Sequence, residues 1–461
     1  MTIIIKNKME LLSNAETSYI RRAREIILDV IEKSLNSVDP RTIIKSKVLL
    51  KDNRLIINDK IFNLDEFDKI FVVGGGKASG SMAKALEEIL GSRIEDGVIV
   101  VPRGESQRYK MHRIRVVEGS HPIPDERSVA SAKEILNLAG RVGEKDLVIG
   151  LISGGGSALM ALPYDGITLG DKQRVTDLLL RSGATINEIN IIRKHLSGIK
   201  GGRLAKSLYP ATILCLLLSD VLGDPLDVIA SGPTVPDSST FSDALDILER
   251  YDLLSKIPVS IRELLMSGAK GLVEETPKAD DPAFKKVHNV VIGNNRLACE
   301  TAAEELKSSG FNTMLLTSLL EGEARHVGTV FGTVAKEISR SGNPISPPAA
   351  IIAGGETTVT VTGQGKGGRN QELCLGAALK IQGLEKTVLA SVSTDGVDGP
   401  TDSAGALVDG WTIARSKRLG MEANDYLRNN DSYSFFSRLG DLVMTGPTGT
   451  NVNDITILLV I

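Results

Sequence analysis

The chain has 461 residues, a formal net charge of −3 and a pI near 6.1, with 42% hydrophobic and 24% charged residues. This composition is typical of a globular chain of two or three domains, and the weak charge and 4% aromatic content argue against a nucleic-acid partner. The longest strongly apolar run, residues 211–218, is far shorter than the roughly 20 residues that span a bilayer. The three cysteines lie far apart without disulfide or zinc-ligand spacing, so we expect a cytoplasmic protein. From the charge and the short apolar runs, we expect it to bind neither nucleic acid nor membrane.

The first part of the chain alternates between apolar runs and amphipathic stretches, after a predicted helix over residues 15–35 and a hairpin over residues 47–58. Apolar runs of strand length lie at residues 71–73, 97–101, 114–117, 146–152 and 212–218. Helical periodicity lies at residues 79–90, 126–139, 171–182 and 187–197. This alternation predicts a mostly parallel sheet with helices on both faces.

The second part repeats the alternation after a polar segment, residues 275–286, whose charges and two prolines make it the best linker candidate. Strands are predicted at residues 288–293, 312–318, 349–355, 357–363, 387–396 and 455–461, and helices at residues 294–308 and 323–341. We therefore predict an α/β protein of two domains, residues 1–285 and 286–461.

Glycine-rich loops follow several of the predicted strands. The first runs from Gly74 to Lys77 and leads into a helix that begins near Ser79. Glycines let a backbone approach a ligand closely, and a helix N-terminus favours an anion. A Walker loop would require glycine where Phe71 stands, so this is a different motif, and a tight turn with a solvated lysine is the alternative.

Further glycine or acidic loops lie at residues 153–157, 354–356, 363–370 and 395–402. Because ligands bind beyond the carboxyl ends of the strands in open α/β sheets, these loops indicate one shared ligand site. The loop GQGKGG at residues 363–368 also matches G-x-G-x-x-G. The acidic residue that a dinucleotide site requires is misplaced, since Glu385 precedes the next strand and Asp395 lies late, so a polyphosphate suits the loop at least as well.

Asp220 ends the most apolar strand, where a carboxylate could orient a hydroxyl, accept its proton or hold Mg²⁺. Asp125 is predicted to cap a helix, and His121 either lines the site or is a buried structural histidine. Five basic residues between Arg193 and Arg203 are expected at a solvated helix end, where cations suit the helix dipole.

Eight motifs in order, among them GGGKASGSMA, SGGGSALMALP, SDVLGDPLDVIASGPTVPD, GGETTVTVTGQGKGGRNQE and STDGVDGPTDSAGA, resemble the glycerate 2-kinase family, whose C-terminal part is called MOFRL. The resemblance covers nearly the whole chain. It implies two α/β domains, the first Rossmann-like, with the active site in the inter-domain cleft. It also implies that ATP and Mg²⁺, or another divalent cation, act on D-glycerate to give 2-phosphoglycerate and ADP. The alternative is an NAD(P)H-dependent hydroxypyruvate reductase, and a homodimer is a further expectation.

By this resemblance the catalytic candidates are Lys77, Asp220, Arg369 and Asp395. Lys77 and Arg369 would neutralise phosphoryl oxygens, or Arg369 would hold the glycerate carboxylate. Asp220 and Asp395 are the candidate metal ligands, and which of the two acts instead as the base stays open, as does a 3-phosphate product. The expected substrate and nucleotide contacts are Gly75, Gly76, Ser79, Ser153, Gly154, Gly155, Gly156, Ser157, Gly365, Lys366, Gly367 and Asn370.

Overall fold

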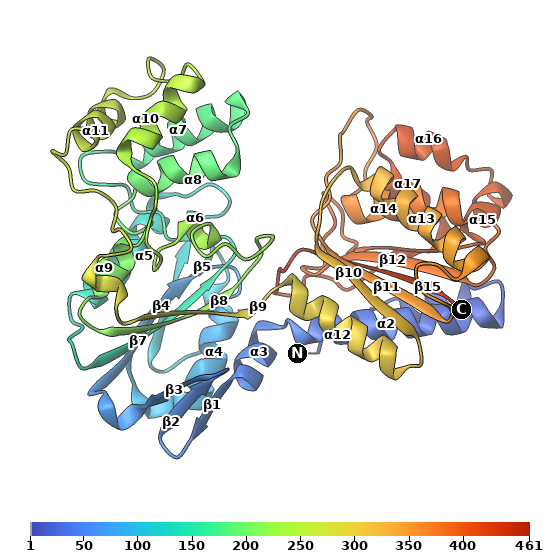
Figure 1. Cartoon of the computed structure of the whole chain (residues 1–461), viewed down its shortest axis with the longest axis horizontal. Coiled ribbons are helices and arrows are strands. Elements are labelled where there is room, and N and C mark those ends of the chain that lie inside the picture. The colour runs from blue at the N-terminus through green and yellow to red at the C-terminus, as the bar shows by residue number, and fades with distance from the viewer. Residues whose placement is uncertain (1) are drawn as a thin grey trace. The chain divides into compact units, whose positions relative to one another are not determined.

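The computed structural model describes residues 2–461, which form two compact units (Figure 1). The parallel-sheet unit is Ile43–Ile292, and the mixed-sheet unit combines the segment that ends at Thr42 with Gly293–Ile461. This division differs from the predicted domains, because the N-terminal segment belongs with the C-terminal half of the chain. Both units are α/β, as predicted.

The parallel-sheet unit is built on six strands in the order β6-β5-β4-β7-β8-β9. β4 pairs in parallel with β5 and β7, and β5–β6 and β7–β8 are also parallel. The strands are β4 (Lys69–Gly75), β5 (Ile94–Pro102), β6 (Ile114–Gly119), β7 (Asp146–Ser153), β8 (Thr212–Leu218) and β9 (Val287–Gly293). The chain moves outward from β4 first in one direction and then, from β7, in the other. This is the 3-2-1-4-5-6 order of a Rossmann sheet, so the Rossmann-like prediction is confirmed, and β4 and β7 flank the topological switch point.

Helices cover this sheet and also form a layer of their own. The helices are α3 (Pro40–Lys47), α4 (Ser79–Leu90), α5 (Glu126–Ala139), α6 (Gly156–Leu159), α7 (Leu169–Ser182), α8 (Ile186–His195), α9 (Arg203–Leu208), α10 (Phe241–Arg250) and α11 (Val259–Ala269). As predicted, the side chain of Asp125 caps α5 by accepting from Arg127 N and Ser128 N. Helices α7, α8, α10 and α11 lie together in Figure 1 and share a separate apolar core around Phe241 and Leu179.

A small antiparallel sheet precedes the Rossmann-type sheet, with β1 (Val48–Lys51), β2 (Arg54–Ile57) and β3 (Lys60–Asn63) in order. The predicted hairpin is confirmed. Asp52 and Asn53 form its two-residue turn with φ of 48° and 56°, the left-handed conformation that such turns require.

The mixed-sheet unit has six strands in the order β10-β11-β15-β12-β13-β14. They are β10 (Asn312–Leu320), β11 (Ala349–Gly355), β12 (Thr387–Ser393), β13 (Gly405–Asp409), β14 (Leu442–Val443) and β15 (Asp454–Val460). The C-terminal strand β15 lies in the middle, antiparallel to both β11 and β12. The carboxyl ends of β11 and β12 therefore meet the amino end of β15 at one edge of the sheet.

The helices of this unit lie on both faces of the sheet, with α2 and α12 on one face and α13 and α14 on the other (Figure 1). They are α1 (Lys8–Ser13), α2 (Ser18–Ser37), α12 (Asn295–Ser308), α13 (Ala324–Ser341), α14 (Arg369–Ile381), α15 (Thr412–Arg418), α16 (Ala423–Arg428) and α17 (Ser432–Leu439). The predicted helix over residues 15–35 is thus α2, and its apolar stripe is buried against the mixed-sheet unit.

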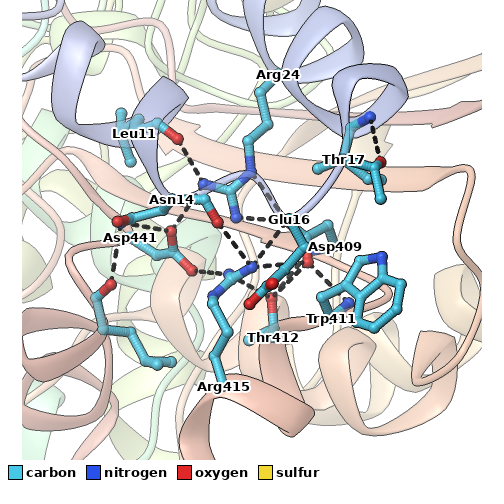
Figure 2. A network of polar contacts seen from close by, with 12 residues as sticks. Leu11, Asn14, Glu16, Thr17, Arg24, Asp409, Trp411, Thr412, Arg415 and Asp441 are labelled. Carbon is cyan, nitrogen blue, oxygen red and sulfur yellow. Dashed lines mark hydrogen bonds and ion pairs between the residues drawn. The ribbon is translucent and has the colours of Figure 1, made fainter.

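A buried charge network, which we call the Arg24 network, fixes α2 to this unit (Figure 2). Arg24 is fully buried, and it donates from Nε to Asp409 (2.9 Å), from Nη1 to Asp441 (2.9 Å) and to the carbonyl oxygen of Leu11 (2.7 Å). Arg415 pairs with the same two aspartates. Two cations and two anions balance. The two aspartates lie 385 and 417 residues from Arg24 in sequence, which explains why sequence order did not reveal this association.

Two local predictions are wrong. Residues 275–286 are no linker, because Glu275 accepts from Nε2 of buried His195 (2.8 Å) and Thr276 donates to Asp237 (3.1 Å), so the segment packs within the parallel-sheet unit. The strand that follows is β9, which completes the first sheet instead of opening a second domain. Residues 357–363 form no strand, because the N–H groups of Thr360 and Thr362 donate to side chains rather than to a neighbouring strand.

Candidate active site

Two glycine loops lie side by side at the switch point of the parallel sheet. Lys77 N donates to the carbonyl oxygen of Gly154 (2.9 Å), and Ala78 N donates to Ser153 Oγ (3.0 Å). A Cβ on Gly76, whose φ is +149°, would lie only 2.1 Å from Ser153 Oγ, so this approach requires glycine. Ser79 is buried and donates to the carbonyl oxygen of Leu151 (3.0 Å).

In the first loop, residues 74–77, the backbone N–H groups are engaged in hydrogen bonds within the protein. The N–H groups of Gly76, Lys77, Ala78 and Ser79 all donate to oxygens of the same unit. What it offers to a ligand is the exposed Lys77 side chain. The second loop is different, because no described residue accepts from the N–H groups of Gly155, Gly156 or Ser157. Its backbone is the one suited to an anion.

Three candidate side chains from different strand ends gather around this second loop. A Cβ on Gly154 would lie 1.9 Å from Oδ2 of Asp220, so the carboxylate that follows β8 packs directly on the glycine after β7. A Cβ on Gly155 would lie 3.3 Å from Cγ of Lys77 and 3.0 Å from Cδ2 of His121, which follows β6. Burial and, less strongly, Lys77 lower the pKa of His121, which favours the neutral imidazole. Lys77, Asp220 and His121 therefore surround one backbone turn.

The other two catalytic candidates belong to the mixed-sheet unit. Arg369 begins α14 and forks onto Asp454, from Nε to Oδ2 (2.6 Å) and from Nη2 to Oδ1 (3.0 Å), while Nη1 donates to Glu356. Burial lowers the pKa of Arg369, but these two carboxylates raise the pKa by more than burial lowers it, so the net shift is upward. Its charge is thus engaged by carboxylates of its own unit.

The acidic side chains beside Arg369 come from the sheet edge where β11, β12 and β15 meet. Asp454 is in register with Gly355 of β11 and with Ser393 of β12. Asp398 is fully buried and accepts from the N–H groups of Asn370 (3.1 Å) and Gln371 (2.9 Å), which caps α14. Burial and the nearby Asp454 raise the pKa of Asp398 to about 7.

Asp395 lies two residues beyond β12 at the same edge and is half-buried. Its Oδ1 accepts from Ser393 Oγ (2.8 Å) and Val397 N (2.9 Å), whereas no described residue donates to Oδ2. Within residues 2–461, no group of three or more His, Cys, Asp or Glu side chains is placed to share a metal ion. Mg²⁺ usually binds one or two carboxylates together with waters and substrate phosphates, so a single available carboxylate fits that cation without a protein cage.

The loop GQGKGG is held by the segment before α17. The N–H groups of Gly363, Gln364 and Gly365 donate to Asn429 or Asn430, and Lys366 N donates to Asp431 (3.1 Å). Asn370 is buried, and its side-chain oxygen Oδ1 accepts from Ser391 Oγ (2.6 Å). A Cβ on Gly367 would lie 2.3 Å from Ser432 Oγ. These contacts give the glycines a packing role, and a phosphate contact at Gly365, Lys366, Gly367 or Asn370 stays a prediction.

The basic residues after Ile192 are the part of the parallel-sheet unit that the sequence interpretation missed. Lys194, His195 and Lys200 are buried, so the prediction of a solvated helix end is wrong. Lys172 of α7 is buried beside them. The sequence did contain a signal for this burial. Several basic residues lie close together in a segment whose apolar spacing already indicates that one helix face is buried in a core.

Comparisons with known proteins find matches over both units of the chain. Residues 26–266 match a family described as domain of unknown function DUF4147, and residues 349–454 match the MOFRL family. The chain is 46% identical to the glycerate 2-kinase of Pyrococcus horikoshii, over 95% of this chain and 97% of that protein. It is 42% identical to the D-glycerate 2-kinase of Thermotoga maritima, over 95% and 98%. A crystal structure of glycerate kinase from Thermotoga maritima superposes with a TM-score of 0.87 at 42% identity, covering 95% of this chain and 100% of that one.

These matches span both units and contain every catalytic candidate. The chain belongs to the glycerate 2-kinase family, as the sequence motifs predicted. No helix within residues 2–461 is both long and apolar enough to cross a membrane.

Proposed function

We propose that this chain is a glycerate 2-kinase, which transfers the γ-phosphoryl group of ATP to D-glycerate and releases 2-phosphoglycerate and ADP. The observation that carries the proposal is the gathering of Lys77 and Asp220 on the second glycine loop, at the switch point of a chain whose full-length relatives bear that name. Phosphoryl transfer needs alignment and positive charge on the phosphoryl oxygens more than covalent chemistry.

Lys77 supplies that charge, and the N–H groups of Gly155, Gly156 and Ser157 supply donors for an oxyanion beside it. Asp220 orients the acceptor hydroxyl and accepts its proton as the oxygen attacks phosphorus. Asp395 is the residue that would hold Mg²⁺, which when bound with the nucleotide neutralises phosphate charge. Arg369 holds Asp454, at the start of β15, and Glu356, directly after β11, in place within the mixed-sheet unit.

A nicotinamide-dependent reductase is disfavoured by the position of the GQGKGG loop. It lies outside the Rossmann-type sheet, and no strand leads directly into it. Its first N–H groups are taken by Asn429, Asn430 and Asp431, so a pyrophosphate would have to displace protein contacts. A dinucleotide fingerprint requires the opposite arrangement.

The test supplies purified protein with D-glycerate and Mg-ATP, and separately with hydroxypyruvate and NADH or NADPH. ADP release with a phosphorus NMR signal for the 2-phosphate supports the proposal, and L-glycerate serves as the control substrate. Nicotinamide oxidation without ADP release contradicts it. ATP as the co-substrate also supports a cytoplasmic location. The predicted homodimer is a separate expectation, which light scattering would test.

A further inference from the structure

The parallel-sheet unit contains a cavity of about 880 Å³ between the second glycine loop and the helical layer. Gly155 and Ser157 form one wall, and residues of α7 and α8 form another. We call it the basic cavity because four cationic side chains line it. These are Lys172, Arg174, Arg193 and Lys200.

Three of these cations are close to one another and have no carboxylate to neutralise them. Lys172 and Lys200 are only 7% and 2% exposed. The amino group of Lys172 has no hydrogen-bond partner among the described residues, and that of Lys200 donates only to the backbone carbonyl of Ser157. The guanidinium group of Arg193 makes no hydrogen bond or ion pair with any residue of the described chain.

The other titratable groups on the wall do not supply the missing charge. Asp177 on α7 is the acidic residue there, and it is exposed and pairs with Arg181 (2.9 Å). His121 also faces the cavity, and its lowered pKa favours the neutral imidazole, which carries no charge. Burial and Arg193 lower the pKa of Lys172 to about 7, and burial, Lys172 and Arg193 lower that of Lys200 well below its ordinary value.

Burying unpaired positive charge destabilises a folded protein, and such clusters occur where a ligand supplies the opposite charge. The cavity is suited to a small anion with hydroxyl groups. Ser157, which lines the cavity, can hydrogen-bond a ligand hydroxyl, and its Oγ lies 2.8 Å from that of the buried Ser231 behind it. Ala158, Ala161 and Ile123 form an apolar part of the wall. Of the three clustered cations, Arg193 is the one with a guanidinium, which stays charged throughout the neutral pH range, and one such group matches a single carboxylate better than a triphosphate.

We propose that Lys172, Arg193 and Lys200 bind the carboxylate of the acceptor hydroxy acid, which places its hydroxyl end toward Gly155 and the Lys77–Asp220 cluster. This inference rests on the proposed kinase function. It assigns the acceptor to the basic cavity and assigns the recognition of its negative charge to residues outside the catalytic candidates.

The experiment measures D-glycerate binding by calorimetry without nucleotide, and KM for D-glycerate and for ATP, in wild type and in Arg193→Met and Lys172→Met. We expect the Kd and KM for D-glycerate to rise about 10- to 100-fold in both variants, with KM for ATP unchanged. Lys133→Met is the control, since Lys133 is an exposed cation of α5 in the same unit and does not line the cavity. Glycerol, which lacks the carboxylate, should bind too weakly to detect in every variant.

A rise in KM for ATP with KM for D-glycerate unchanged would mean that the nucleotide occupies the cavity, and the proposal would fall. Unchanged Kd for D-glycerate in Arg193→Met would overturn it as well. Both results leave the kinase function intact if wild type still releases ADP. Failure of wild type to phosphorylate D-glycerate would instead remove the proposed function, while calorimetry still reports whether the cavity binds a carboxylate.

Discussion

Replacing Arg24 with Met should unfold the mixed-sheet unit at a markedly lower temperature. The substitution keeps an unbranched apolar stem but removes the charge that faces Asp409 and Asp441, both fully buried. Arg415 alone would then balance two buried carboxylates. The carbonyl oxygen of Leu11 would also lose its donor.

The magnitude follows from leaving one buried carboxylate uncompensated, which costs about 3–5 kcal/mol. For a unit of this size each kcal/mol lowers Tm by roughly 2–4 °C, so the decrease should be about 6–20 °C. Burial raises the pKa of Asp409, but Arg24 and Arg415 lower it more, so the net shift is downward. The network's contribution is therefore present at neutral pH and is lost as the pH falls through the folded-state pKa of that carboxyl.

Trp411 makes the assay specific to the mixed-sheet unit. It is the single tryptophan of the sequence, and its backbone N–H donates to Asp409 (2.8 Å), so its fluorescence reports the surroundings of the network. Arg22→Met is the matched control, because Arg22 lies on the same helix with its side chain 67% exposed and should change stability by less than about 0.5 kcal/mol.

Adding Asp441→Asn to Arg24→Met restores charge balance and should recover part of the lost stability. The reasoning is refuted if Arg24→Met unfolds within about 1 kcal/mol of wild type by Trp411 fluorescence. Equal loss of stability in Arg22→Met would refute it too, since burial would then not be the cause.

Four further predictions concern the site. Lys77→Ala should lower kcat by about 100-fold or more with the thermal transition unchanged, because an exposed turn lysine contributes little to stability; near-normal kcat would return it to a plain turn residue. Asp220→Asn should lower kcat far more than it raises KM for D-glycerate, as expected for a group that acts in the transition state, and a change in KM alone would make it a binding residue. Arg369→Lys loses the fork onto Asp454 and should destabilise the mixed-sheet unit by about 1–3 kcal/mol in urea titrations, whereas unchanged stability would argue against its anchoring role. Lys172→Met should stabilise the protein by up to about 5 kcal/mol at pH 6. Its pKa falls from 10.5 unfolded to about 7 folded, so the cost of burying the charge is full below pH 7 and fades toward pH 10; thermal scans with no gain at pH 6 would contradict this.

Short-range patterns in the sequence were enough to predict most elements and the loops that carry the site. The helices at Ser79–Leu90 and Glu126–Ala139 have the predicted bounds, because their apolar spacing and their end residues are local signals. The glycine loops after β4 and β7 were identified for the same reason. Alternation of strands and helices also predicted a parallel sheet, and a parallel sheet brings its strand ends to one edge.

Contacts between distant residues decided what local patterns could not. The segment that ends at Thr42 belongs to the mixed-sheet unit, where buried Arg24 pairs with Asp409 and Asp441. Strand β9 completes the first sheet although it follows a polar segment. The loop GQGKGG has the spacing of a phosphate loop, but Asn429 and Asn430 reach it and take its N–H groups.

The sequence by itself determined the type of most of the elements that it predicted, the family and the side chains at the strand ends, since all of these depend on residues close together along the chain. Only the tertiary structure decided how deeply a side chain is buried and which charges it meets. A helical period of 3.6 residues shows on which side of a helix Lys172 and Arg193 lie, but not what packs over that side. Burial of those cations beside the glycine loop depends on α7, α8 and the strand ends meeting in space, and the free energy of a charge depends on that surrounding rather than on its neighbours in sequence.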